Sequence, residues 1–232
     1  MSIQRATHAA TVERYIQSHL APEDPSLLNA RNNSLKHGIP PIALSANQGK
    51  FLNLLASCSG ARNVLELGTL GGYSSIWLAR AVKSSSGKVT SIEINPDRRE
   101  VAIQNLRSAG IKVPEEVDVV LGAGLAVFPQ LEEEIQRGER ERFDFVFIDA
   151  DWPNQWKYFD YGVKLAAGKG SVIFVDNVVL AMLDYGQVGP EEKDESVVPL
   201  VEAVAKDQRV EAVVMQTVGA KQYDGFLMAV VK

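Results

Sequence analysis

Acidic and amide side chains follow two apolar segments of the chain at the point where each segment ends. Asp149 follows the run 143–148, and Asp176 and Asn177 follow the run 171–175. Two carboxylates and one amide carbonyl suit Mg²⁺ or a similar divalent ion and leave positions open for water or a substrate. These three residues are therefore candidate metal ligands; the alternative is that the aspartates only cap turns, as aspartate often does.

A glycine-rich segment, residues 64–75, reads Val-Leu-Glu-Leu-Gly-Thr-Leu-Gly-Gly-Tyr-Ser-Ser. This pattern indicates a buried strand, a tight turn and the start of a helix. Glycine allows positive φ and close approach of the backbone to a ligand, and the helix offers unpaired N–H groups to an anionic group. Such a turn serves dinucleotides, phosphates and S-adenosylmethionine alike, so it predicts a cofactor site without selecting the cofactor.

Two further strand ends could complete an adenosine site. Glu93 lies 25 residues after Gly68, and a carboxylate there could accept hydrogen bonds from both ribose hydroxyls of NAD or of S-adenosylmethionine. The alternative is a solvated carboxylate at a strand end. Gly122 and Gly124, which flank Ala123, could admit a flat adenine or form an ordinary turn.

Aromatic residues surround the acidic segment and could wall a planar substrate. They are Trp152, Trp156, Tyr158 and Tyr185. Aromatic side chains at helical spacing more often belong to the core, so we expect Trp156 and Phe159 to pack inward. We expect Trp152, directly after Asp-Ala-Asp, to be exposed at the site.

The elements that must position these residues alternate between strands and helices. Strands are predicted at 63–67, 88–94, 117–121, 143–148, 171–175, 210–216 and 226–231, and helices at about 73–83, 96–110, 125–137, 154–166 and 197–204, with a loop at 176–192. This alternation predicts an α/β fold with a mostly parallel sheet and helices on both faces. The last two strands have only a short link between them, so one closing strand should run antiparallel. Ligands of such sheets bind beyond the carboxyl ends of the strands, where the candidate residues lie.

The N-terminal segment predicts a helical cover over the rest of the chain. Residues 8–20 form an apolar helical face of Val12, Tyr15, Ile16 and Leu20, and residues 27–36 predict a second helix. Ser45 and Gln48 fit a capping box that starts a third helix. We therefore expect a single domain over 1–232, with a cover at 1–40 and a core at 41–232.

Composition narrows the class of protein. The net charge of -5 argues against a dedicated nucleic-acid binder. No apolar run is long enough to span a bilayer, and the first twenty residues lack a signal-peptide core. The single cysteine, Cys58, fits a reducing compartment and is expected to be a buried helix residue. Together these features lead us to expect a cytoplasmic protein that binds neither nucleic acid nor membrane.

Three segments together resemble the cation-dependent O-methyltransferases, the group that contains catechol and caffeoyl-coenzyme A O-methyltransferases. They are Val-Leu-Glu-Leu-Gly-Thr-Leu-Gly-Gly-Tyr-Ser at 64–74, Phe-Ile-Asp-Ala-Asp at 147–151 and Val-Asp-Asn-Val-Val at 175–179. The resemblance runs from about Ser45 to the C-terminus. It implies a Rossmann-like methyltransferase fold, a seven-stranded mostly parallel sheet with one antiparallel strand, and S-adenosylmethionine as methyl donor.

The resemblance also implies roles for individual residues. By position, Asp149, Asp176 and Asn177 match the ligands of a divalent cation, most simply Mg²⁺, with Ca²⁺ or Mn²⁺ as alternatives. The implied cofactor-binding residues are Leu44, Glu66, Gly68, Thr69, Ser74, Glu93, Gly124, Asp149 and Asp151. The implied reaction is methyl transfer to a small aromatic hydroxyl compound that chelates the metal, by an enzyme that forms a homodimer.

One departure from the family pattern concerns the catalytic residues, which are implied to include Asp149 and the residue at position 152. Many members have a lysine at this position that acts as a base, whereas this chain has Trp152, which cannot accept a proton. Either the metal alone makes the hydroxyl acidic enough, or another group serves as the base, or the acceptor is already acidic or is not a catechol, or the protein binds the cofactor without catalysis. A nicotinamide-dependent oxidoreductase would use the same glycine turn but would leave the acidic cluster unexplained.

Overall fold

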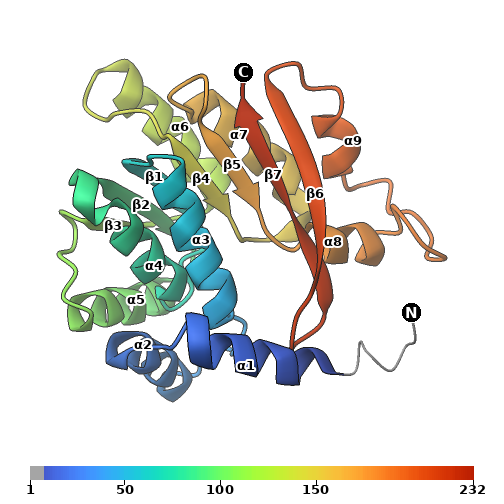
Figure 1. The fold of residues 1–232 in the computed structure, drawn as a ribbon. Coiled ribbons are helices and arrows are strands. Elements are labelled where there is room, and N and C mark those ends of the chain that lie inside the picture. Colours follow the sequence, from blue (N-terminus) through green and yellow to red (C-terminus); the bar gives the residue numbers. More distant parts are fainter. Residues whose placement is uncertain (1–7) are drawn as a thin grey trace.

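Seven strands form one sheet in the order β3-β2-β1-β4-β5-β7-β6 in the computed structural model, which describes residues 8–232 (Figure 1). The strands are β1 (Asn63–Leu67), β2 (Lys88–Glu93), β3 (Val117–Leu121), β4 (Phe145–Ile148), β5 (Val172–Val175), β6 (Val210–Val218) and β7 (Tyr223–Val231). Strands β1 to β5 pair in parallel, and β7 is antiparallel to both of its neighbours. The predicted α/β sheet with one antiparallel strand is therefore confirmed.

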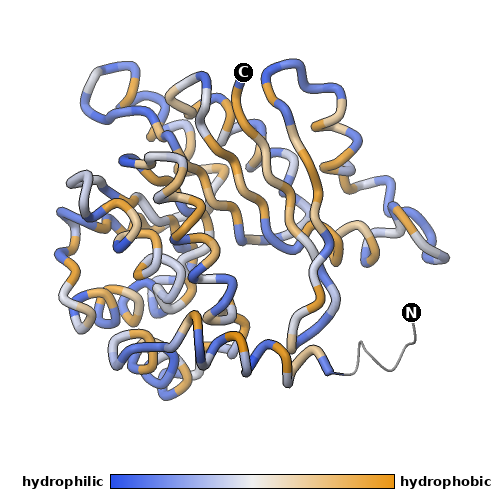
Figure 2. Tube along the Cα trace, in the orientation of Figure 1, coloured by the Kyte–Doolittle hydropathy of each residue, from blue (hydrophilic) through white to orange (hydrophobic). Residues whose placement is uncertain are grey.

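Helices cover both faces of the sheet because the central strands are apolar on both sides. Val64, Phe145 and Phe147 pack toward one face, and Leu65 and Ile148 pack toward the other. The first face is covered by α3 (Ala46–Cys58), α4 (Tyr73–Val82) and α5 (Pro96–Ser108), and the second by α6 (Gly124–Gln136), α7 (Gln155–Leu165) and α9 (Leu200–Val204). Figure 2 shows the hydrophobic residues concentrated along the strands.

The N-terminal helices α1 (Ala9–Leu20) and α2 (Pro25–Lys36) agree with the predicted pair. Asp24 caps α2 by accepting hydrogen bonds from the N–H groups of Ser26 and Leu27. Helix α1 buries none of its side chains, so its apolar face remains exposed on this chain. The predicted capping box of α3 is confirmed, with Ser45 and Gln48 bonding each other's backbone N–H groups.

Three sequence-based expectations differ from the structure. The predicted loop 176–192 contains a helix, α8 (Val178–Asp184), which begins directly after Asn177. Helix α9 starts at Leu200, because Pro199 is extended and disfavours helical backbone in the residue before it. Cys58 is exposed rather than buried, since it lies in the last turn of α3, beyond the part that packs on the sheet.

Residues 8–232 contain no helix whose length and apolar character would let it traverse a lipid bilayer.

Candidate active site

The carboxyl ends of β1, β4 and β5 lie level with one another. Leu67 pairs with Ile148, and Ile148 pairs with Val175. The ladder continues one residue further, because the N–H of Asp149 donates to the Leu67 carbonyl and the N–H of Asp176 donates to the Ile148 carbonyl, each at 2.9 Å. The residues that follow the three strands therefore form a row at one edge of the sheet, as parallel strand ends require.

Gly68 occupies the β1 position in this row and must be glycine. Its φ is +98°, and a Cβ atom there would overlap the carbonyl oxygen of Asp149. The glycine therefore lets the turn after β1 approach the backbone that carries Asp149. The glycine-rich segment predicted close approach to a ligand; the contact that the structure shows is with the backbone of Asp149.

Two cavities open at this edge of the sheet. The larger, about 800 Å³, is called here the glycine-side cavity; the candidate residues that line it are Gly68, Glu93, Gly124, Asp149, Asp151, Trp152 and Asn177. The smaller, about 500 Å³, is called the hairpin-side cavity and lies between α1, residues 42–45 and the β6–β7 hairpin. Both have volumes usual for small-molecule sites.

The two cavities meet at the predicted metal ligands. Asp149 and Asn177 line both cavities, and Asp176 lines the hairpin-side cavity. A ligand in one cavity would therefore lie beside a ligand in the other, with these side chains at the junction. The structure brings all three predicted metal ligands together.

The surroundings of the two aspartates disfavour negative charge. Burial raises the pKa of Asp149, and the nearby carboxylates of Glu66 and Asp224 raise it further. Burial and the charge of Asp149 likewise raise the pKa of Asp176, partly offset by the N–H of Asn177. No donor among the described residues makes a hydrogen bond to the Asp149 carboxylate at ordinary geometry. A bound cation would supply the missing partner.

The junction offers an amide oxygen beside two carboxylates. No group of three or more His, Cys, Asp or Glu side chains in residues 8–232 is arranged to hold a metal ion. The candidate set at the junction is Asp149, Asp176 and the amide of Asn177. Oxygen-only donors of this kind fit Mg²⁺, Ca²⁺ or Mn²⁺ rather than softer metals.

Glu93 and Gly124 lie on the wall of the glycine-side cavity. Glu93 accepts hydrogen bonds from the N–H of Leu70 at 2.8 Å and of Asn95 at 3.0 Å. A carboxylate has about four lone-pair sites, so two remain for a ligand. A Cβ at Gly124 would lie 2.7 Å from Leu67 and 3.2 Å from Tyr158, so a glycine is needed for the backbone to pack this closely against the two side chains.

Glu66, Thr69 and Ser74 line neither cavity. Glu66 is fully buried beneath the glycine turn, where one carboxylate oxygen accepts hydrogen bonds from the hydroxyls of Ser75 and, at 2.6 Å, Ser91. Its other oxygen, Oε1, has no partner within the described chain. Thr69 is hydrogen-bonded to Ser91 at 2.5 Å. These three residues, which the family resemblance implies at the cofactor, therefore lie off the walls of both cavities.

The aromatic residues divide between the site and the core. Trp152 is partly buried and lines the glycine-side cavity, as does Tyr158, whose hydroxyl bonds the Asp151 carboxylate. Trp156 stacks on Phe159, with ring centroids 6.0 Å apart, and packs inward as predicted. Trp156 and Tyr185 line neither of the two cavities, so they do not wall the site.

The β6–β7 hairpin contributes residues that the sequence analysis did not identify. Lys221 and Gln222 line both cavities, and Asp224 lines the hairpin-side cavity. Lys221 donates from Nζ to the carbonyl of Ala43 at 2.6 Å, and burial lowers its pKa. The only signal in the sequence is an Asp-Gly pair at the start of an otherwise apolar last strand.

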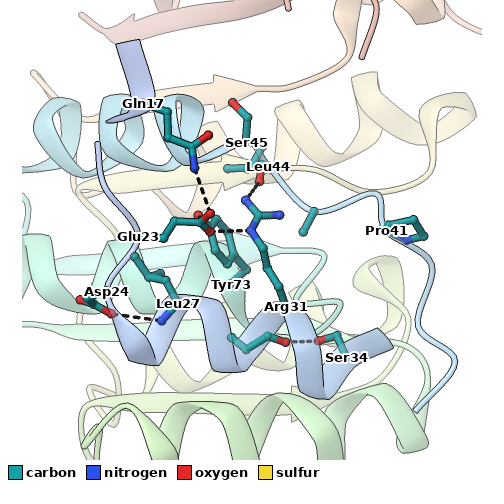
Figure 3. A network of polar contacts seen from close by, with 12 residues as sticks. Gln17, Glu23, Asp24, Leu27, Arg31, Ser34, Pro41, Leu44, Ser45 and Tyr73 are labelled. Carbon is teal, nitrogen blue, oxygen red and sulfur yellow. Dashed lines mark hydrogen bonds and ion pairs between the residues drawn. The ribbon is translucent and has the colours of Figure 1, made fainter. Parts of the chain in front are cut away.

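A polar network behind the site joins the N-terminal helices to Leu44 (Figure 3). Glu23 accepts hydrogen bonds from Arg31 at 2.5 Å, from the hydroxyl of Tyr73 at 2.7 Å and from Gln17 at 3.1 Å. Arg31 also donates to the Leu44 carbonyl at 2.7 Å and lies 3.9 Å from the Tyr73 ring. The segment that contains Leu44 is thus held from the inside by Arg31 and, at Ala43, from the other side by Lys221.

Comparison with known proteins identifies the family. Residues 17–229 match the O-methyltransferase family. The chain is 41% identical over 231 residues to the O-methyltransferase imqG of Aspergillus flavus, covering 95% of this chain and 90% of that protein. It is 39% identical over 235 residues to a catechol O-methyltransferase of Mycobacterium tuberculosis, covering both chains in full.

A solved structure agrees with this assignment. The O-methyltransferase of Bacillus cereus, in complex with SAH, superimposes with a TM-score of 0.88 at 38% identity, covering 98% of this chain and 100% of that one. The family match spans nearly the whole chain, including every candidate site residue named above. The chain therefore belongs to the O-methyltransferase family.

Proposed function

We propose that the protein transfers a methyl group from S-adenosylmethionine to the hydroxyl of a small aromatic, catechol-like compound, with the help of a divalent cation. The observation that carries this proposal is the junction of the two cavities at Asp149 and Asn177. A methyl donor in one cavity and an acceptor in the other would meet there. Holding two reactants in contact in this way supplies much of the rate acceleration of a group transfer.

The glycine-side cavity is the proposed site of S-adenosylmethionine. The two free lone-pair sites of Glu93 suit the ribose hydroxyls, and Gly68 and Gly124 leave room for the sulfonium end and the adenine. The complex of the Bacillus cereus relative with SAH, the product left after methyl transfer, supports this cofactor. The buried, unpaired oxygen of Glu66 is a further acceptor near the turn.

Asp149, Asp176 and Asn177 are the proposed ligands of the cation, with Mg²⁺ the first choice and Ca²⁺ or Mn²⁺ the alternatives. The absence of donors on the Asp149 carboxylate within the described chain, and the raised pKa of both aspartates, fit such a role. When bound, a cation would lower the pKa of a coordinated hydroxyl, as it does for bound water. The protein would then not need a lysine at position 152.

The hairpin-side cavity is the proposed site of the acceptor. Val12, Ile16 and Ile42 give it an apolar wall that suits an aromatic ring. The catechol O-methyltransferase of Mycobacterium tuberculosis supports a catechol-like acceptor. Trp152, which lines the adjoining glycine-side cavity, favours a second candidate, namely a non-catechol acceptor, because an apolar ring stands where the family resemblance implies a base.

The test is methyl transfer from labelled S-adenosylmethionine to a panel of catechols and other phenols, with Mg²⁺ and with excess chelator. We expect transfer that is lost on chelation and lost in Asp149→Ala. Asp144→Ala is the matched control, because Asp144 lies at the opposite end of β4, where it accepts only backbone N–H groups. Transfer that survives chelation would remove the metal from the mechanism, and cofactor binding without transfer to any phenol would favour another acceptor.

We further propose that the protein is a homodimer. Large apolar side chains are exposed on α1, α3 and β6, including Val12, Phe51, Val213 and Met215. Strand β6 is also at the edge of the sheet, with unpaired backbone groups. Exposed apolar edges of this kind are usually covered by a partner.

A further inference from the structure

Asp224 makes a hydrogen bond to one of the proposed metal ligands. It is the second residue of β7 and is 9% exposed. Its Oδ2 accepts a hydrogen bond from the side-chain amide nitrogen of Asn177 at 2.8 Å. Its Oδ1 accepts from the backbone N–H of Leu180 at 3.1 Å and of Gly225 at 2.7 Å.

These contacts determine which side-chain atom of Asn177 faces Asp224 and which faces the cavities. A side-chain amide has one oxygen that accepts and one nitrogen that donates. Because the nitrogen is engaged by Asp224, the oxygen is left to face the junction of the two cavities. A flipped amide would bring its oxygen against the Asp224 carboxylate, and two acceptors cannot bond each other.

The contact is built by close packing between α8 and β7. A Cβ at Gly225 would overlap the carbonyl oxygen of Met215 and would lie 2.5 Å from Val179 Cγ2. The glycine therefore lets α8 lie directly against β7. This approach brings Asp224 both to Asn177 and to the N–H of Leu180.

We propose that Asp224 is a positioning residue that fixes the amide of Asn177 with its oxygen toward the cation. The inference rests on the proposed metal site. Asp224 is not itself a ligand, because both of its oxygens already accept N–H groups. Residues that orient metal ligands in this way commonly affect metal affinity by about 10- to 100-fold.

The substitution Asp224→Asn tests the orientation directly. The amide introduced at position 224 would keep its oxygen on the N–H groups of Leu180 and Gly225, so its nitrogen would face the nitrogen of Asn177. Asn177 can relieve this clash of two donors only by flipping, which turns its nitrogen toward the cation. We expect Mg²⁺ or Mn²⁺ affinity, measured by calorimetry on chelator-stripped protein, to fall by about 10- to 100-fold.

The double variant Asn177→Asp/Asp224→Asn exchanges the amide and the carboxylate. The nitrogen at position 224 would then donate to the carboxylate at position 177, whose second oxygen faces the cation. All hydrogen bonds and the net charge of the site are retained, and aspartate tolerates the left-handed backbone at 177, where φ is +58°. We expect this variant to recover most of the metal affinity lost in Asp224→Asn.

Asp144→Asn is the matched control, since Asp144 also accepts two backbone N–H groups, from Arg62 and Asn63, but far from the site. Its metal affinity should equal that of the wild type. If wild type and Asp224→Asn bind metal equally, or if the folded double variant recovers no metal affinity, the positioning role of Asp224 is overturned while the proposed metal site stands. A wild-type protein that binds no metal overturns both the assignment and the proposed metal mechanism.

Discussion

Glu66 is fully buried under the glycine turn, and one of its carboxylate oxygens has no hydrogen-bond partner within residues 8–232. Burial raises the pKa of this carboxyl above its ordinary value of 4.5, although hydroxyls of Ser74, Ser75 and Ser91 oppose the shift. The folded protein thus holds the Glu66 proton more tightly than the unfolded chain does. This arrangement makes the residue costly for stability unless a ligand reaches the free oxygen.

The first prediction concerns Glu66→Gln. Because the folded-state pKa is raised, the stabilising effect of protonation is present below about pH 4.5 and is lost as pH rises through the folded-state pKa. The free energy of unfolding of the ligand-free wild type should therefore fall over this window, and the fall should be smaller in Glu66→Gln. At pH 8 we expect the variant to be more stable by about 1–3 kcal/mol, the usual cost of a buried unpaired group.

Urea unfolding of wild type and variant between pH 4 and pH 8 measures this difference. Glu211→Gln is the control, because that side chain is 84% exposed and should leave the pH profile unchanged. If the free energy of unfolding changes with pH in the same way in wild type and Glu66→Gln, the pKa of Glu66 is not raised in the folded protein. Weaker binding of S-adenosylmethionine by Glu66→Gln would place the free oxygen at the cofactor.

At the scale of single residues, the sequence could predict which side chains lie close together where their positions follow from strand order. Asp149 and Asp176 come directly after neighbouring parallel strands, so their proximity follows from the register of β4 and β5. The contact between Asp224 and Asn177 joins residues 47 positions apart through the packing of α8 on β7. Nothing in either local sequence specifies that contact.

The β6–β7 hairpin is the element on which the acceptor side of the site depends. It carries Lys221, Gln222 and Asp224, and its tip is tied to α1 by a hydrogen bond from the N–H of Ala220 to Glu13. The place where it packs against α8 is Gly225. A change at this glycine should therefore act on the element and on the site together.

The second prediction is that Gly225→Ala destabilises the protein and weakens metal binding. The added methyl would overlap the Met215 carbonyl of β6 and would lie 2.5 Å from Val179 Cγ2 of α8, so relieving the second contact separates α8 from β7. Overpacking of this kind costs about 1–3 kcal/mol. Thermal unfolding and metal calorimetry measure the two effects.

Gly219→Ala, in the same hairpin, is the control because the nearest atom to its added methyl is 3.5 Å away, an ordinary contact. It should change neither stability nor metal affinity. If Gly225→Ala also changes neither stability nor metal affinity, the packing of α8 on β7 at Gly225 does not control the position of Asn177.

The third prediction concerns the attachment of the N-terminal helices (Figure 3). Glu23 accepts bonds from Gln17, Arg31 and Tyr73, and its side chain is only 9% exposed. Glu23→Gln removes the charge and turns one oxygen into a donor. Since hydrogen bonds to charged groups are worth about 1.5–3 kcal/mol, we expect a loss of stability of that order.

Chemical unfolding of Glu23→Gln measures the loss, and Glu139→Gln is the control. Glu139 also pairs with an arginine, Arg137, but on the exposed surface, where such pairs contribute little. Its substitution should leave stability unchanged. Similar stability for both variants would mean that the network does not anchor α1 and α2.

Element types were predictable where hydrophobic periodicity is long, and not where an element is short. The strands and long helices follow from runs such as 63–67 and 117–121, which match their observed bounds. Helix α8 was missed because its seven residues are almost all apolar and carry no helical period. The link to the sheet is only two residues, Asp176 and the left-handed Asn177, which leaves no room for a recognisable loop.

At the scale of the whole molecule, the order of elements was sufficient to predict the sheet. Strands separated by helices must pair in parallel, and the two last strands, joined by a short link, must pair antiparallel. The position of the N-terminal helices could not be obtained this way. It depends on the Glu23 network and on the hydrogen bond from Ala220 in the hairpin tip to Glu13, which links residues 207 positions apart.

The fourth prediction concerns assembly. Strand β6 lies at the edge of the sheet, and Val213 and Met215, on one face of it, are 53% and 51% exposed. Side chains two residues apart in a strand point to the same face, so a charge at Met215 would disturb the apolar surface that a second copy would cover. The wild type should sediment at twice the chain mass of 25.3 kDa, and Met215→Lys at that mass itself.

Sedimentation of both proteins over a range of concentrations measures this shift, with Gln104→Lys as the control. Gln104 is exposed on α5, which lies by β3 at the opposite edge of the sheet from β6 (Figure 1), so its substitution should leave the dimer intact although it adds the same charge. A monomeric wild type would contradict the proposed homodimer, and a dimeric Met215→Lys would move the interface away from this face of β6. Because α1 buries none of its side chains, a dimer that also covers α1 would bring the partner chain beside the hairpin-side cavity.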